Sequence, residues 1–89
     1  MGANMTDVEI GAGEVQIFHD GDYKVYSVQN IRDEDAYVIT FDKDGRDDPD
    51  KVVKTHFRKL SKGVVDGTHI MVIGSGGNGT ILRFVELTE

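Results

Sequence analysis

Residues 48–63 read Asp-Pro-Asp-Lys-Val-Val-Lys-Thr-His-Phe-Arg-Lys-Leu-Ser-Lys-Gly, and this stretch decides which fold class the sequence predicts. Its apolar and aromatic side chains recur at a helical period instead of alternating. At ~100° per residue they fall within an arc of ~140°, which is one face of a helix. These residues are Val52, Val53, His56, Phe57 and Leu60.

The ends of the same stretch carry helix start and stop signals. Asp48 is suited to the N-cap, and Pro49 suits the first helical position because its missing N–H is not needed there. Lys59 and Lys62 stand in the last turn, where cations favour the helix dipole, and Gly63 follows as the terminating residue. The sequence therefore predicts an amphipathic helix over residues 49–62.

Strands are predicted on both sides of this helix. The strongest is Ala36–Phe41, a run of β-branched and aromatic residues. The chain before it alternates weakly, with turns expected at Gly11–Gly13 and at Asp20-Gly21. After the helix, Val64–Gly67 is expected to be a turn. Further strands are predicted at residues 8–10, 14–18, 23–31, 69–73 and 80–87.

The order of these elements, β-β-β-α-β-β, predicts an α+β domain built on antiparallel hairpins. Asp20-Gly21, Tyr37–Phe41 and Phe57–Leu60 follow one another as in a Tudor or SH3-like small barrel, which residues 14–60 resemble. The chain departs from that pattern in having no tryptophan and a full helix where the barrel has a short connection. We expect a twisted antiparallel sheet or half-open SH3-like barrel of five or six strands, with the helix packed across it.

That resemblance would imply an aromatic cage for methylated side chains. The residues that could supply one are Tyr23, Tyr26, Tyr37 and Phe41.

The composition indicates one globular domain spanning residues 1–89. Residues 1–4 are interpreted as disordered or as a remnant of expression, because a second methionine stands at Met5. No apolar run approaches the ~20 residues of a membrane span, and no secretory signal opens the chain. Cysteine is absent, which excludes disulfides and thiolate metal sites and favours a cytoplasmic protein.

Positive charge is concentrated in the predicted helix. Residues 51–62 hold five of the ten Lys and Arg and none of the sixteen Asp and Glu, so they carry +5 while the remainder carries 5 − 16 = −11. On the helical wheel, four of these cations would form one stripe opposite the apolar face, and we expect them to bind a partner. They are Lys51, Lys54, Arg58 and Lys62. A solvated helix face with no partner is the alternative interpretation.

The loop before the helix is a second, weaker candidate for partner binding, through Asp42, Asp44, Asp47 and Asp48. Its aspartates suggest calcium, but counting from Asp42 places Arg46 and Asp47 where an EF-hand needs an oxygen ligand and a glycine. We interpret the loop as a turn and helix cap and predict no metal site, with a weak, irregular cation site as the alternative interpretation.

The remaining motifs give no catalytic or cofactor signature. The glycine-rich segment 74–79 lacks the lysine of a Walker loop and leads into a strand, whereas a dinucleotide site needs a helix there. We interpret it as a hairpin tip, with ordering on a partner as the alternative. His19, His56 and His69 lie in separate elements without metal-ligand spacing. We therefore predict a protein that is not an enzyme and has no cofactor.

Together these features predict a small acidic binding or regulatory protein that acts through protein–protein contact, with homodimerisation as one form of that contact. Its size and charge resemble those of host modulators encoded by viruses or mobile elements. The alternative is a nucleic-acid-binding module that uses the basic helix, with each neutralised phosphate adding salt-dependent affinity.

Overall fold

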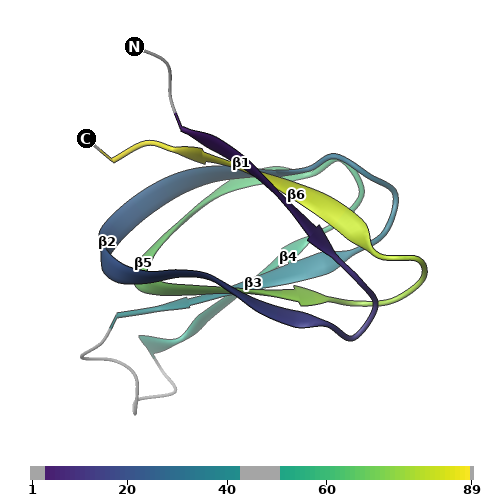
Figure 1. Cartoon of the computed structure of the whole chain (residues 1–89), viewed down its shortest axis with the longest axis horizontal. Helices are drawn as coiled ribbons and strands as arrows, with labels where there is room; N and C mark the ends of the chain where they lie inside the picture. Colours follow the sequence, from purple (N-terminus) through teal and green to yellow (C-terminus); the bar gives the residue numbers. More distant parts are fainter. Residues whose placement is uncertain (1–3, 43–50, 89) are drawn as a thin grey trace.

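The computed structural model describes residues 4–42 and 51–88, and all of its regular elements are strands (Figure 1). The predicted α+β class is wrong: the described chain is all-β, with no α-helix. The six strands are β1 (Met5–Ile10), β2 (Val15–Asn30), β3 (Ala36–Phe41), β4 (Val53–Phe57), β5 (Lys62–Gly74) and β6 (Thr80–Glu86).

The strands form one antiparallel sheet in the order β1-β6-β2-β5-β3-β4. Two of them, β2 and β5, are long and bent, and they pair with each other on both sides of the bend. Residues 15–20 of β2 lie beside residues 69–73 of β5, and residues 24–29 lie beside 62–67. The register shifts between Asp20 and Lys24, where the pair turns sharply.

The bends fold the sheet over, so that it forms two layers (Figure 1). The β1 layer consists of β1, β6, the second half of β2 and the first half of β5. The β4 layer consists of the first half of β2, the second half of β5, β3 and β4. Side chains from the inner sides of both layers make the core.

The predicted helix over 49–62 is replaced by β4 and a turn. The same residues also satisfy a strand period: Val53, Thr55 and Phe57 alternate with Lys54 and His56. Pairing with the edge of β3 supplies backbone hydrogen bonds that decide between the two periods, and β-branched residues favour the extended form. The helical apolar face is not buried as a unit, because Val53 and Leu60 are 55% and 59% exposed while Phe57 is 1% exposed.

The residues at the predicted end of the helix form a turn and the start of β5 instead. Leu60 adopts a left-handed conformation with φ 59°, and the Ser61 amide donates to the Arg58 carbonyl, which makes a tight turn into β5. Gly63 lies within β5, and a Cβ there would stand 3.4 Å from the Phe57 ring. The glycine therefore gives that ring room and does not end a helix.

Of the other local predictions, some are confirmed and others are wrong. The strand Ala36–Phe41 and the turn at Gly11–Gly13 are confirmed. The turns predicted at Asp20-Gly21 and at Val64–Gly67 are wrong, since both segments lie inside the long bent strands β2 and β5.

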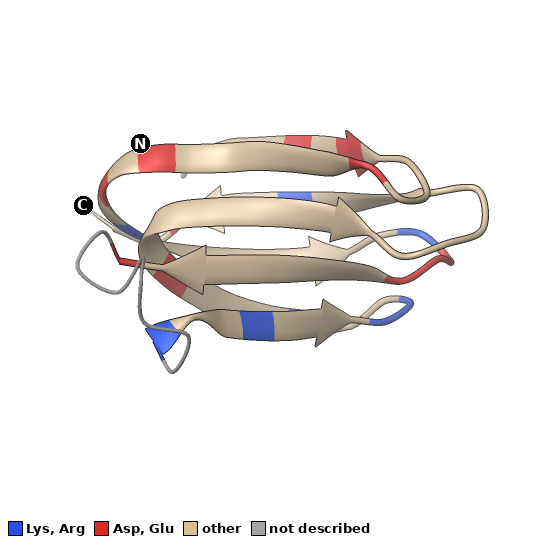
Figure 2. Cartoon of the chain, turned by 90° about the horizontal axis from the view of Figure 1, so that it is seen from below, with Lys and Arg blue, Asp and Glu red and all other residues tan. Residues whose placement is uncertain are grey.

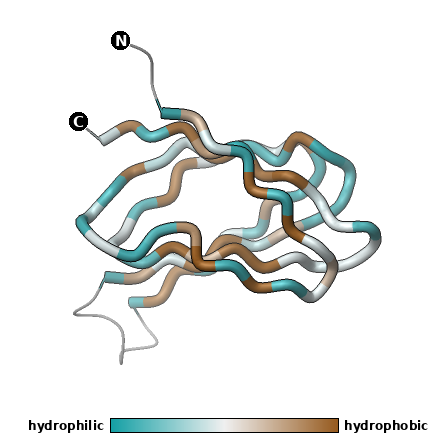
Figure 3. Tube along the Cα trace, viewed as in Figure 1, coloured by the Kyte–Doolittle hydropathy of each residue, from teal (hydrophilic) through white to brown (hydrophobic). Residues whose placement is uncertain are grey.

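The core is a single cluster between the two layers. Figure 3 shows hydrophobic residues recurring along the strands of both layers. Phe18 of the β4 layer stacks on Phe84 of the β1 layer, with ring centroids 3.9 Å apart, and Tyr26 meets both rings edge-on. The fully buried members include Ile10, Val28, Val38, Ile70, Val72, Leu82 and Phe84.

A buried asparagine joins the strands at one end of the molecule. The Asn30 amide nitrogen donates to the carbonyls of Glu34 and Phe57, at 2.7 and 3.0 Å. Its amide oxygen accepts from the Arg32 backbone N–H and from the Thr80 hydroxyl, at 3.1 and 2.7 Å. Because Phe57 ends β4, this side chain fixes β4 relative to β2 and β6.

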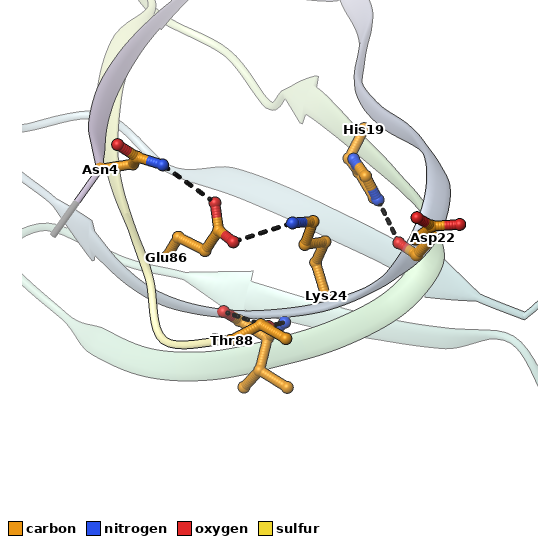
Figure 4. A network of polar contacts seen from close by, with 7 residues as sticks. Asn4, His19, Asp22, Lys24, Glu86 and Thr88 are labelled. Carbon is orange, nitrogen blue, oxygen red and sulfur yellow. Dashed lines mark hydrogen bonds and ion pairs between the residues drawn. The ribbon is translucent and has the colours of Figure 1, made fainter.

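The opposite end is fixed by a polar network near the chain termini (Figure 4). The Lys24 ammonium lies 2.9 Å from the Glu86 carboxylate, which also accepts from the Asn4 amide. The hydrogen bond from Lys24, followed by that from Asn4, holds the pKa of Glu86 below its ordinary value. The same bond raises the pKa of Lys24. Thr88 bonds to the backbone of Val25, so the chain end is tied to the bend of β2.

None of the elements formed by the described residues is a helix of sufficient length and apolarity to cross a bilayer.

Candidate interaction face

The outer side of the β4 layer carries three rows of side chains that run across its strands, and we call this surface the open face. The register aligns Val15, Ile73, Tyr37 and His56 in the first row, and Ile17, Met71, Ile39 and Lys54 in the second. Asp20, His69 and Phe41 form the third.

The outer side of the β1 layer is mixed: one row, formed by Met5, Val85, Ser27 and Val64, is largely apolar, and the row beside it is charged. The register there aligns Asp7, Arg83, Gln29 and Lys62 in one row. The Asp7 carboxylate accepts two hydrogen bonds from Arg83, at 2.9 and 3.1 Å, and these bonds lower the pKa of Asp7. A charged row of this kind is typical of a solvated sheet face.

The open face is apolar at its centre because β3 and β5 are apolar on both sides. Tyr37, Ile39 and Phe41 point outward between buried Ala36, Val38 and Thr40, and Met71 and Ile73 do the same on β5. Continuous apolar runs are typical of strands covered on both faces. These outward side chains are half-buried. The most exposed members are Ile17 and Val15, at 70% and 53%.

One corner of the open face is held by a histidine. The Nε2 atom of His69 lies 3.0 Å from Asp20, and its Nδ1 atom lies 2.8 Å from the Thr68 hydroxyl. The imidazole stacks on Phe41 with ring centroids 4.8 Å apart. Beside this pair lies a shallow hollow of about 230 Å³ lined by Ile17, His19, Asp20, Phe41, His69 and Met71. The hollow exposes the apolar side chains of the face between a few fixed polar groups.

The opposite margin, along β4, is cationic. The Lys54 ammonium lies 4.4 Å from the centroid of the Tyr37 ring, in a cation–π contact. His56 stacks on Tyr37 at 4.6 Å, and its Nε2 atom lies 2.8 Å from the Asp35 carboxylate. These contacts hold Lys54 and His56 against the open face.

Charge is therefore separated across the β4 layer. Figure 2 shows Asp and Glu near the first half of β2 and Lys and Arg along β4 and its flanking residues, with β3 and the second half of β5 uncharged between them and acidic residues at both ends of β3. The acidic margin consists of Asp20 and Asp22, and the basic margin of Lys51, Lys54 and Arg58, with Asp42 beside Lys51. Asp35 lies near the basic margin, where it pairs with His56.

The four cations predicted to form one stripe do not share a helix face. Lys54 lies on the open face, and Lys51 and Arg58 flank β4 on either side. Lys62 begins β5 and lies opposite Gln29 in the β1 layer. The structure thus keeps three of the four along one sheet edge and separates the fourth from them.

The acidic loop is described only at its start. Asp42 lines a hollow of about 210 Å³ with Tyr23, Lys51 and Asp66, whereas Asp44, Asp47 and Asp48 lie outside the described residues. Within residues 4–42 and 51–88, no group of three or more His, Asp and Glu side chains is placed to hold a metal ion.

The aromatic residues expected to form a cage do not converge. Tyr26 is buried in the core and Tyr37 stacks under His56 on the open face. Tyr23 donates to Asp66 at 2.6 Å, which raises the pKa of the tyrosine, and Phe41 stacks on His69. The contacts of the four rings therefore do not support a site for a methylated cation.

The glycine-rich segment connects β5 to β6, with Gly77 and Gly79 at positive φ, but the predicted hairpin is wrong, because β5 and β6 are not neighbours in the sheet. Next to it lies a polar hollow of about 410 Å³ whose lining includes Glu9, Glu14, Arg32 and Asn78.

Comparisons of the chain with protein-family models, with curated proteins and with solved structures found no match.

The central residues of the open face were missed as candidate site residues in the sequence. The sequence does carry a signal for them: residues 36–41 and 70–73 are apolar at nearly every position. A strand with one solvated face alternates between apolar and polar residues instead. What the sequence lacked was the register that places Ile17 and Lys54 beside these strands.

Proposed function

We propose that this protein is a non-enzymatic binding protein that acts through the open face on a protein partner. The observation that carries the proposal is that two adjacent strands, β3 and β5, present half-buried apolar side chains outward beside the exposed Val15 and Ile17 of β2. Contiguous exposed apolar surface framed by polar residues is typical of protein–protein interfaces.

The polar groups around the face support the same use. Asp20 and Asp35 each already contact a histidine, so covering the face would not leave these carboxylates without partners. The aromatic rings of Tyr37 and Phe41 are fixed by stacking, which limits the side-chain entropy lost on binding. The absence of cysteine supports a cytoplasmic location for this activity.

The test is affinity capture from lysate of the source cells with three matched baits: the wild-type protein, Ile17→Asp and Val64→Asp. Ile17 and Val64 are similarly exposed, at 70% and 64%, but Val64 lies on the other layer. We expect proteins retained by wild type and Val64→Asp to be lost with Ile17→Asp. Equal retention by all three baits would assign binding to another surface.

A second candidate, nucleic-acid binding, is favoured by the cations that follow one another along β4. In an extended strand, Lys51, Lys54 and Arg58 span roughly 23 Å, a length over which several phosphates could be contacted. Binding of generic RNA and DNA at two salt concentrations tests it. Replacing Lys54 and Arg58 by Gln should reduce the salt dependence, and absence of binding at low salt removes this candidate.

A further inference from the structure

The open face is complementary to itself. It has an acidic margin on β2, an apolar centre on β5 and β3, and a basic margin on β4 (Figure 2). We infer that its partner is a second copy of this chain, docked face to face about a two-fold axis parallel to the strands. This inference rests on the proposed function and specifies the partner.

The symmetry follows from the order of the strands. A two-fold axis that lies between the faces and runs along the strands exchanges the two margins. It therefore places β2 of one copy over β4 of the other, and β5 over β3. Apolar residues then meet apolar residues at the centre, and opposite charges meet at both margins. A two-fold axis perpendicular to the strands would place β4 over β4 and bring like charges together.

The positions of charge along the strands fit the same axis. The first half of β2 and β4 run in opposite directions in the layer, so Asp20 and Lys51 lie towards the same end. A rotation about an axis along the strands does not change a residue's position along the strand direction. The Asp20 end of β2 thus comes near the Lys51 end of β4 in the second copy.

The area of the open face sets the expected strength of dimerisation. Four strands spaced ~4.8 Å apart and about five residues long cover a flat area of roughly 300 Å². Because side chains project from this plane, the accessible surface of the open face is roughly 500–600 Å² per copy. A stable interface of standard size buries about 800 Å² per partner, so this dimer should be weak and reversible. Aligned packing of two sheets at about −30° accommodates the geometry.

Sedimentation equilibrium of the purified chain, from about 1 μM to 1 mM, tests the inference first. We expect a monomer–dimer equilibrium for wild type and for Val64→Asp. Met71→Asp should raise the dissociation constant at least 100-fold, because it buries a carboxylate in the apolar centre, opposite Ile39 of the second copy. A wild-type protein that stays monomeric throughout, or a Met71→Asp variant that dimerises as wild type does, would overturn the inference.

Charge complementation tests the orientation. One variant carries Asp20→Lys with Asp22→Lys, so that both margins are basic; the other carries Lys51→Glu with Lys54→Glu, so that both are acidic. We expect each alone to dimerise at least tenfold more weakly than wild type, and an equimolar mixture to recover dimers. Circular dichroism confirms that each variant is folded. A mixture no stronger than its components would overturn the proposed axis.

The two proposals fail separately. A monomeric wild-type protein whose capture of another protein still depends on Ile17 would remove self-association and leave the proposed function standing. If dimerisation does not respond to Met71→Asp and capture does not respond to Ile17→Asp, both are overturned.

Discussion

Replacing Asn30 by Leu is expected to cost more stability than any other polar substitution of similar size in the described chain. The side chain is fully buried and makes four hydrogen bonds, to Glu34, Phe57, Arg32 and Thr80. Leucine has a similar volume, so the change removes the bonds without opening a large cavity.

The expected loss of stability follows from the polar groups that lose their hydrogen-bond partner when Asn30 is replaced. Two of the four bonds are buried, those to the Phe57 carbonyl and the Thr80 hydroxyl, and each orphaned group costs ~1–3 kcal/mol. The other two partners can reach water. The expected loss in free energy of unfolding is therefore about 3 kcal/mol, a large part of the ~5–10 kcal/mol typical of a domain this small.

Urea unfolding followed by far-UV circular dichroism measures the loss, with Thr80→Val as a matched control. That control removes a single bond and leaves the Asn30 oxygen with the Arg32 N–H, so it should cost about 1 kcal/mol. Hydrogen exchange should show the amides of β4 losing protection in Asn30→Leu before those of β2, because Phe57 loses its anchor. A change within about 0.5 kcal/mol of wild type, with β4 still protected, would refute the reasoning.

Three further predictions concern the rest of the fold. Gly74→Ala should destabilise by more than about 3 kcal/mol in urea unfolding, since its Cβ would stand 1.9 Å from the Gly11 carbonyl oxygen; a folded variant with wild-type stability would show that this backbone approach is wrong. Phe84→Ala should cost ~3–5 kcal/mol in the same assay because the ring fills the space between the layers, and a loss below about 1 kcal/mol would contradict that packing. The ion pair of Lys24 with Glu86 lowers the pKa of the carboxyl in the folded state, so its contribution is full above the ordinary carboxyl pKa and is lost as pH falls through the lowered folded value. Because the pKa of Lys24 is raised, its contribution is full below the ordinary lysine pKa and is lost as pH rises through the raised folded value. Thermal unfolding of Glu86→Gln should therefore depend less on pH at the acid end than wild type does, and an unchanged acid dependence would assign no role to the pair.

The strands with the plainest local pattern could be predicted from the sequence, and the bent ones could not. Ala36–Phe41 combines β-branched and aromatic residues without a competing turn signal, and it is a strand with those bounds. Asp20-Gly21 has the chemistry of a hairpin turn, yet β2 continues through it, because pairing with β5 on both sides of the bend supplies the backbone bonds.

The helix prediction failed because residues 51–60 satisfy two periods. Val53, Thr55 and Phe57 fit a strand as well as Val53, Phe57 and Leu60 fit a helix, and local capping signals favoured the helix. The edge of β3 decides for the strand, and that edge is formed by residues distant in sequence. The charge asymmetry was visible from the start, but its place along one sheet margin depended on this register.

The most direct test of the account is an isotope-filtered NOE experiment on an equal mixture of labelled and unlabelled chains. It detects contacts between copies and excludes those within one copy. We predict intermolecular cross-peaks from the Ile17 methyl groups to Lys54, and from the Met71 methyl group to Ile39. Intermolecular cross-peaks confined to the β1 layer, for example at Val64, or none at millimolar concentration, would contradict the claim that the open face is covered by its own copy.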